Sequence, residues 1–197
     1  MMQMQRQFNN PSNSQQDQDP TYKLEECLKV TFDSLDKPFT PTTNLEFYQA
    51  SILPQLTQQP RIIINGTPFG SKPTFQQVWS KLPATQHQVS SFDCHLVPSS
   101  VPGANRQFII LVHLKVRFDE SGKTRLGDSA DLLNVGQPGQ NSGLPTRPAG
   151  PKPYSRWFGA TVTIVADENI VLNFDAESIS SFDYRITEAP ENSVFII

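Results

Sequence analysis

One stretch constrains the fold of this chain more than any other. Residues 106–120 read RQFIILVHLKVRFDE and alternate between two sides along their whole length. The first side is apolar at every position and comprises Phe108, Ile110, Val112, Leu114, Val116 and Phe118. Period-two patterning over so many residues predicts a long β-strand with one face on a hydrophobic core.

The second side of this strand is more informative about function. It changes from apolar to basic along the strand, through Ile109, Leu111, His113, Lys115 and Arg117. Such a side fits neither an ordinary solvated face nor a second core. A partly apolar sheet face that the rest of the chain does not obviously cover suggests a protein partner. The alternative at this point is a central strand partly covered by its own loops.

The segments before residue 85 predict mainly helices. Asp19-Pro20 is typical of a helix start, with Asp19 as N-cap and proline at the first helical position. Asn44 is expected to cap a second helix, and Pro73 to open a third. The buried sides are expected to be Leu24, Cys27, Leu28, Thr31 and Leu35, then Leu45, Tyr48 and Ile52, then Phe75, Val78, Trp79 and Leu82.

Strand signals dominate the remainder. Asn65-Gly66 predicts a hairpin turn between residues 61–64 and 67–69, because both turn residues tolerate positive φ. The apolar phase shifts between residues 85 and 97, which predicts a β-bulge near Ser90-Ser91. Further strands are expected at 157–166, 170–174 and 179–186. Their outward positions include Thr161, Thr163, Asp183 and Arg185.

Helices followed by a run of antiparallel strands define an α+β fold. Three amphipathic helices can cover only one face of such a sheet. The opposite face, to which strand 106–120 contributes its apolar-to-basic side, then needs solvent or a second subunit.

The length of 197 residues favours one domain, over residues 20–197, preceded by a tail. Residues 1–19 hold six glutamines and three asparagines with almost nothing to bury, so we expect them to be disordered. They contain no apolar run, so we expect no secretory signal, and no run elsewhere is long enough for a membrane span. Cys27 and Cys94 are therefore expected to be free thiols inside the cell. The apolar end, residues 194–197, is expected to pack on its own domain.

Residues 121–156 form a long insertion between predicted strands. They contain six of the ten glycines and five prolines. The insertion has a net charge of +3, which leaves −6 for the remainder of a chain with net charge −3. A flexible basic loop on an acidic body suits RNA phosphates or an acidic surface, although a solvated linker is the alternative. Its basic residues are Lys123, Arg125, Arg147, Lys152 and Arg156.

Candidate chemistry is sparse. His87, His95 and His113 could approach Asp93, and a histidine–aspartate pair could act as a general base and its orienting partner. The strand phase, however, places His113 away from the helices and outside any cavity. Cys94 and His95 are adjacent and point to opposite faces, so they do not form a metal site. The residues favour no cofactor, no metal and no enzymatic activity.

Two groups of residues resemble known proteins. The first is similar to the middle of nuclear transport factor two-like domains and comprises Asn65-Gly66-Thr67-Pro68, Phe75, Trp79, Leu82-Pro83, His87-Gln88-Val89, Phe92-Asp93-Cys94 and Val97. The second is KVRFDESG at residues 115–122, with the proline-containing insertion and the ending from Phe182-Asp183-Tyr184 to Ile197. This group resembles the fungal family of mRNA transport regulators, the small subunits of a heterodimeric mRNA export receptor. The resemblance covers about residues 20–197.

The resemblance implies a cone-like fold, in which a strongly bent antiparallel sheet enfolds three helices. It also implies pairing of sheet faces with the large subunit of the mRNA export receptor. The heterodimer would carry mRNA, and also ribosomal subunits, through nuclear pores by contacts with nucleoporin Phe-Gly repeats. The chain would then work in the nucleus and nuclear pore and shuttle to the cytoplasm.

Combined with the strand phase, the resemblance predicts where the partner binds. The expected contacts are Ile109, Leu111, His113, Lys115, Arg117, Thr161, Thr163, Asp183 and Arg185. A one-residue register error would move a whole set of these side chains to the other face. The basic insertion is the expected contact for RNA or pre-ribosomal subunits.

Two rival functions share this fold. A homodimeric import carrier of the GTPase Ran would use acidic residues near a strand end, for which Asp119-Glu120 could serve. A cone-cavity isomerase or dehydratase would need a polar base inside the cone, such as the histidine–aspartate pair. The inward positions are almost all apolar, which disfavours the enzyme.

Overall fold

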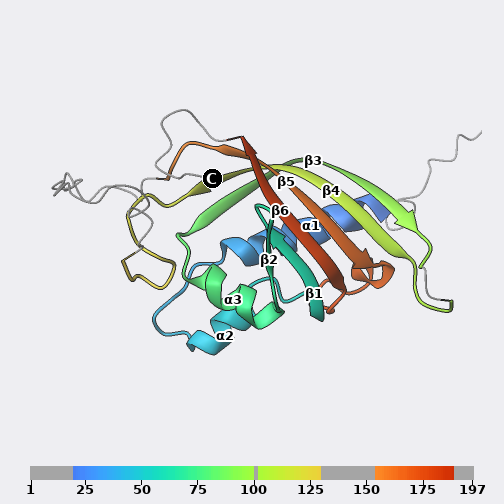
Figure 1. Ribbon diagram of the computed structural model, residues 1–197, viewed down its shortest axis with the longest axis horizontal. Coiled ribbons are helices and arrows are strands. Elements are labelled where there is room, and N and C mark those ends of the chain that lie inside the picture. Colours follow the sequence, from blue (N-terminus) through green and yellow to red (C-terminus); the bar gives the residue numbers. More distant parts are fainter. Residues whose placement is uncertain (1–19, 100–101, 130–153, 189–197) are drawn as a thin grey trace, which may run out of the picture.

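The structure, a computed structural model, describes residues 20–99, 102–129 and 154–188. In this part of the chain, a six-stranded sheet arches over three α-helices (Figure 1). The helices are α1 (Pro20–Asp36), α2 (Leu45–Ala50), α3 (Lys72–Ser80) and the 3₁₀ helix η2 (Glu168–Val171). The strands are β1 (Leu56–Ile64), β2 (Thr67–Phe69), β3 (Thr85–Val97), β4 (Gln107–Phe118), β5 (Phe158–Asp167) and β6 (Ile179–Glu188).

The sheet runs in the order β2-β1-β6-β5-β4-β3. Neighbouring strands are antiparallel except β1 and β6, which are parallel. The sheet is therefore mixed, whereas the sequence predicted an antiparallel one. Hydrophobic alternation reports which face of a strand is buried but not which strand lies beside it, so the parallel pair left no signal in the sequence.

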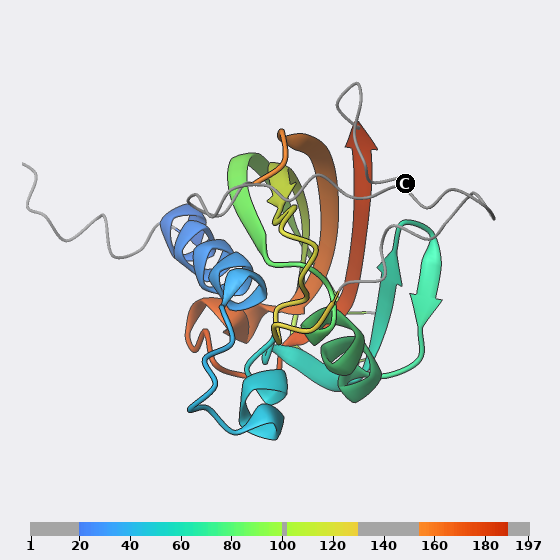
Figure 2. The same ribbon diagram turned by 90° about the vertical axis from the view of Figure 1, so that its left-hand side faces the viewer.

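All three helices lie on the concave side of the bent sheet (Figure 2). The predicted inner side of α1 is confirmed, because each of its five residues is at most 2% exposed. In α3, Phe75 and Trp79 are buried as predicted, but Val78 is 38% exposed, so the prediction for Val78 is wrong. The core forms between these helical stripes and the inner side of the sheet.

Local turn and cap signals in the sequence correspond to real features. The Asn44 side chain accepts a hydrogen bond from the Glu46 backbone N–H at 2.8 Å and begins α2. Asn65 and Gly66 have φ of 48° and 82°, the left-handed values that a two-residue hairpin turn requires. The register of β3 against β4 shifts between Val89 and Ser91, which confirms the bulge.

The strand predicted at 170–174 does not exist. The Asp167 side chain accepts a hydrogen bond from the Asn169 backbone N–H and starts η2, so the chain turns into a 3₁₀ helix and a bend. A short apolar run fits either state by composition alone, and here the cap decides it. The Asp19 N-cap, the tail at 1–19 and the apolar end at 194–197 lie outside the described residues. No helix in the described part of the chain is long and apolar enough to cross a bilayer.

Candidate partner-binding site

The convex side of the sheet carries the predicted partner-binding residues. We call the outward side chains of β4, β5 and β6 the outer sheet face. Along β4 and β5 the inward residues are buried except for the half-buried Phe118, whereas the outward residues are exposed or half-buried. Because strand side chains alternate, one register places all nine predicted positions on this outer face. Their contact with a partner stays a prediction.

Strand pairing brings these residues together in rows across the sheet. Leu111 lies opposite Thr163, and Thr163 lies opposite Asp183. In the next row, Ile109 lies opposite Val165. Ile109 and Leu111 are 39% and 38% exposed, so β4 and β5 together present a small apolar centre. Val165 was not among the predicted contacts, although its outward position in the strand places it in this apolar centre.

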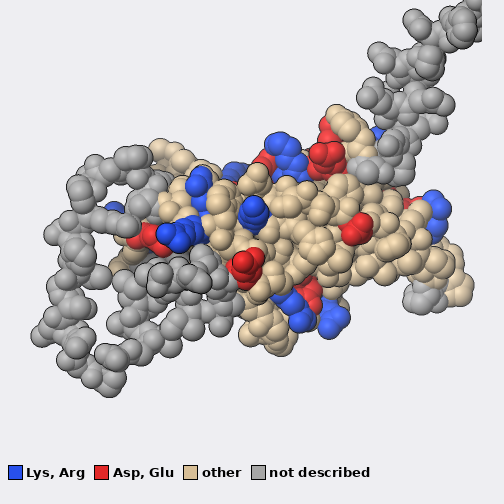
Figure 3. Space-filling view, turned by 90° about the horizontal axis from the view of Figure 1, so that it is seen from above, with Lys and Arg blue, Asp and Glu red and all other residues tan. Residues whose placement is uncertain are grey.

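Polar side chains surround the apolar centre. His113 lies opposite Thr161, and Thr161 lies opposite Arg185. The Arg185 guanidinium donates to both carboxylate oxygens of Asp183 at 2.9 and 3.0 Å. Lys115 is exposed further along β4. Figure 3 looks onto this side of the molecule, where a broad uncharged area separates isolated charged groups. An apolar centre with a polar rim is the usual anatomy of a protein interface.

Arg117 is held in place by its own chain. Its guanidinium lies 4.8 Å from the centre of the Tyr154 ring and 4.7 Å from that of Trp157. Its Nε and one terminal nitrogen both donate to the Gln86 side-chain oxygen. The cation is therefore fixed at one end of the outer sheet face by contacts within its own chain.

The basic insertion is only partly what the sequence suggested. Arg125 was predicted to contact RNA, but it is 8% exposed and this prediction is wrong. Its guanidinium donates to the Leu35 carbonyl and the Thr85 hydroxyl and lies 5.2 Å from the centre of the Trp79 ring. Burial lowers the pKa of Arg125 to about 10, so it remains a cation at neutral pH. The burial of Arg125 could not be predicted from periodicity, because a single arginine in a loop belongs to no repeating pattern.

The other basic residues of the insertion differ in their positions. Lys123 and Arg156 are exposed, and Arg147 and Lys152 lie outside the described residues. Isolated bridges join Asp119 to Tyr154 and Lys123 to Ser129. Both described ends of the insertion therefore lie on the domain, and a contact with RNA stays a prediction for the exposed residues alone.

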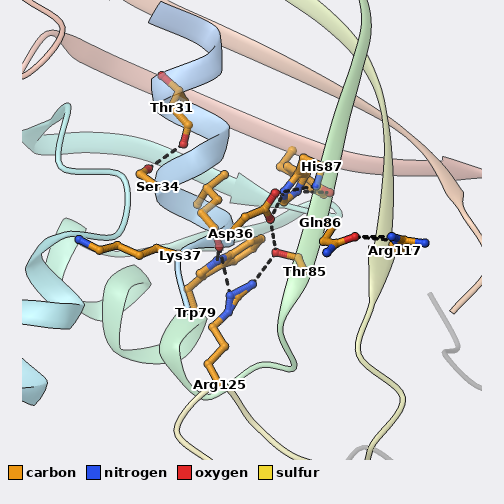
Figure 4. A network of polar contacts seen from close by, with 12 residues as sticks. Thr31, Ser34, Asp36, Lys37, Trp79, Thr85, Gln86, His87, Arg117 and Arg125 are labelled. Carbon is orange, nitrogen blue, oxygen red and sulfur yellow. Dashed lines mark hydrogen bonds and ion pairs between the residues drawn. The ribbon is translucent and has the colours of Figure 1, made fainter. Parts of the chain in front are cut away.

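A polar network crosses the interior beneath the sheet (Figure 4). The His87 ring pairs through Nδ1 with Asp36 at 2.6 Å, and its Nε2 lies 3.2 Å from the Tyr184 hydroxyl. Asp36 also accepts from the Thr85 hydroxyl at 2.7 Å and from the His87 backbone N–H at 2.7 Å. The predicted partner of the histidine, Asp93, is instead exposed on β3 opposite Leu111.

The network is arranged for structure rather than for reaction with a substrate. The His87 side chain is 0% exposed, and both of its ring nitrogens have partners. Burial alone would raise the pKa of Asp36, but the hydrogen bonds and charge of His87, with the Thr85 hydroxyl, outweigh it and lower that pKa. Burial raises the pKa of the Tyr184 hydroxyl well above its ordinary value, which keeps it neutral.

The remaining candidates carry little chemistry. Within the described ranges no three His, Cys, Asp or Glu side chains lie close enough to hold a metal ion. Cys27 and Cys94 are both free thiols, and burial raises the pKa of each. Asp119, considered for a Ran site, is 6% exposed, and its carboxylate accepts from the Ser121 backbone N–H at 2.8 Å.

Comparison with known families identifies the family of the chain. The family model described as nuclear pore RNA shuttling protein Mtr2 matches residues 12–197. The chain belongs to the Mtr2 family. This confirms the resemblance to fungal mRNA transport regulators that the sequence indicated.

Two relatives support membership in the Mtr2 family. The mRNA transport regulator MTR2 of Candida albicans is 36% identical over 188 residues, which cover 90% of this chain and 97% of that protein. The mRNA transport regulator MTR2 of Saccharomyces cerevisiae is 33% identical over 139 residues, 70% of this chain and 73% of that protein.

Solved structures agree with this family. The Mtr2 chain in a crystal structure of the C. albicans Mtr2–Mex67 M domain complex superimposes with a TM-score of 0.69 at 36% identity. That match covers 89% of this chain and 100% of the other. A bacterial scytalone dehydratase homologue from Novosphingobium aromaticivorans gives a TM-score of 0.50 at 6% identity over 88% of this chain and 87% of the other, which shows a shared fold alone.

Proposed function

We propose that this chain is the non-enzymatic small subunit of a heterodimeric mRNA export receptor, and that its outer sheet face binds a Mex67-like large subunit. The observation that carries the proposal is the half-exposed apolar centre around Ile109 and Leu111, on a sheet face that the described helices leave bare. The C. albicans relative was solved in complex with the Mex67 M domain, which identifies the class of partner.

The outer sheet face exposes apolar side chains that no described element covers. Side chains such as Ile109 gain nothing from water, and roughly 25 cal/mol is recovered for each Å² of apolar surface that a partner covers. The fixed guanidinium of Arg117 and the Asp183–Arg185 pair provide polar contacts at the rim, where they set orientation more than affinity. The subunit would work at the nuclear pore, contact nucleoporin Phe-Gly repeats and shuttle to the cytoplasm with mRNA cargo.

The test is a binding measurement between the full chain and the NTF2-like domain of its own species' large subunit. Leu111→Asp places a charge in the centre of the proposed interface and is expected to weaken binding by about 30-fold or more. Leu172→Asp is the matched control, because Leu172 is 74% exposed near η2, off the outer sheet face. Equal affinities for the two variants, in a calorimetric titration, would reject this face.

A measurement of self-association separates the rival functions. A homodimeric Ran carrier would self-associate through the outer sheet face with no large subunit present, and Leu111→Asp would abolish that dimer. Light scattering of the chain alone measures this directly. A heterodimer subunit is expected to associate one-to-one with the large subunit instead.

For the insertion, we propose that its exposed basic residues contact RNA or pre-ribosomal subunits. Lys123 and Arg156 support this because both are exposed beside the ends of the insertion. Lys123→Glu with Arg156→Glu reverses the two exposed charges and leaves Arg125 intact. This double variant is expected to form the heterodimer unchanged while binding RNA more weakly in a salt-dependent manner. Unchanged RNA affinity of the double variant, in filter binding at two salt concentrations, would refute the proposal.

A further inference from the structure

A groove between α1 and β3 lies apart from everything assigned so far. It encloses about 850 Å³ and has Leu28, Phe32 and Phe92 among its lining residues. Phe32 packs with its ring centre 5.4 Å from that of His87, so the floor of the groove rests on the interior network. Figure 2 shows α1 beside the β3 end of the sheet, and residues of both elements line the groove.

The strand that forms one wall of the groove has a free edge. β3 is the terminal strand of the sheet and, among the described strands, pairs only with β4. No described strand pairs with its other edge. On β3 the His87 N–H donates to Asp36, and beyond the bulge the edge can accept another strand. The bulge inserts Ser90 into β3, next to Val89, which lines the groove and is 38% exposed.

Beyond the bulge, the inward side of β3 is not fully covered. Phe92 lies opposite Val112, and Leu96 lies opposite Phe108. The two β4 residues are 0% and 6% exposed, but Phe92 is only half-buried and Leu96 is 41% exposed. The inward apolar residues of β3 therefore extend beyond the part of the strand that α1 covers.

The rim of the groove is acidic. Glu25 and Glu26 of α1 line it, and both are exposed. The nearby Lys29 is held by Asp33 at 2.6 Å and does not neutralise them. Two carboxylates without an ion-pair partner among the described residues favour a cationic ligand.

We propose that this groove binds an extended basic peptide segment of another protein, added as a further strand along the free edge of β3. The peptide backbone pairs with β3, one large apolar side chain packs against Phe32 and Phe92, and flanking lysines or arginines face Glu25 and Glu26. Strand addition of this kind takes its affinity from main-chain hydrogen bonds and its specificity from side-chain pockets. Because the groove lies on the concave side of the sheet, it stays open when a partner covers the outer sheet face.

The proposal is tested with the full-length chain and a fluorescein-labelled peptide, STKTFTKTS, whose two lysines share one strand face with the phenylalanine. We expect saturable binding by fluorescence anisotropy, both for the chain alone and for its complex with the large subunit. A peptide with glutamates in place of the lysines, and one methylated on alternate backbone nitrogens, are each expected to bind at least tenfold more weakly. Absence of saturable binding, or equal binding of all three peptides, would overturn the proposal.

Two variants of the chain locate the binding site. Glu25→Gln with Glu26→Gln removes two negative charges from the rim and is expected to weaken binding about fivefold. Asp175→Lys changes the net charge by the same amount at an exposed site outside the groove lining and is expected to change binding less than twofold. Equal weakening by both would show that only net charge matters and would overturn the site.

Amide chemical shifts provide a second readout. Peptide addition is expected to shift resonances of α1 and β3 and to leave the centre of β5 unperturbed. Shifts confined to the outer sheet face would overturn the assignment. Self-association of the chain that the Glu25→Gln, Glu26→Gln variant abolishes would assign the groove to a second copy of the chain instead. The peptide test and the heterodimer test can fail independently of each other, because the two proposed sites lie on opposite sides of the sheet.

Discussion

Ile109 and Ile110 are neighbours on β4, yet the first is 39% exposed and the second 1%. On the inner side, helices and sheet bury most apolar groups, and polar groups such as Asp36 and Thr85 share hydrogen bonds. On the outer sheet face, apolar and polar groups stand side by side in solvent. The comparison shows that the chain buries its inner core and leaves a second, smaller apolar surface in solvent, which is what a face that binds a partner requires.

The polar groups differ between the two sides as well. Inside, Asp36, His87 and Thr85 form one connected network in which removal of any member leaves a buried group without its partner. Outside, the Asp183–Arg185 pair is solvated, and such pairs contribute little to folding. Stability therefore resides on the concave side, and recognition is expected on the convex side.

The sharpest test of this contrast replaces the two isoleucines in turn. Ile110→Ala leaves a cavity in the core and is expected to lower the free energy of unfolding by about 2–5 kcal/mol. Ile109→Ala is expected to change it by less than about 0.5 kcal/mol and to weaken large-subunit binding instead. Urea unfolding and titration with the large subunit measure the two effects. Equal loss of stability for both variants would break the comparison.

The insertion offers a second matched pair, Arg125 and Arg156. Arg125→Ala removes hydrogen bonds to Leu35 and Thr85 and the contact with Trp79, so we expect a loss of about 2–3 kcal/mol in unfolding free energy. Arg156→Ala, at an exposed site, is expected to have no measurable effect on unfolding. If Arg125→Ala were as stable as the wild type, the packed position of this arginine would be refuted.

Asp36→Asn tests the interior network through its pH dependence. At neutral pH we expect a loss of about 1.5–3 kcal/mol, because hydrogen bonds to a charged group are lost. The pKa of Asp36 is lowered in the folded chain, so its stabilisation is present above the ordinary aspartate pKa of about 3.9 and is lost as the pH falls through the folded-state pKa.

Unfolding midpoints measured from pH 7 down to pH 3 check whether the stabilisation by Asp36 is lost in acid. The difference in unfolding midpoint between wild type and Asp36→Asn is expected to be largest near neutral pH and to decrease below about pH 4. Asp93→Asn, at an exposed site of β3, serves as control and is expected to follow the wild type throughout. A gap that widens in acid would contradict the role given to Asp36.

The smallest expected effect concerns the rim of the outer sheet face. Lys115→Glu is expected to leave stability within about 0.5 kcal/mol of wild type, since the side chain is exposed. It is expected to slow association with the large subunit by a few-fold at low salt, an effect that fades as salt screens the charge. Stopped-flow association at two ionic strengths measures this. A salt-independent change would place Lys115 in a desolvated centre instead.

Much of the fold could be predicted from the sequence, because these features depend on residues that are close together in the chain. The alternation in residues 106–120 separates the two sides of β4, and the phase break in β3 marks its bulge. Asn65-Gly66 sets its turn through backbone freedom alone. The family followed from short motifs, which the match over residues 12–197 confirms.

What the sequence by itself determined is the division of each strand and helix into a buried and an open side, because periods of two and 3.6 residues are written into neighbouring positions. The tertiary structure alone decided which distant groups meet. It set β1 parallel to β6, joined His87 to Asp36 across 51 residues, and drew Arg125 into the core against Leu35, 90 residues away. Such pairings depend on how the whole chain closes around its core, and no local pattern encodes them.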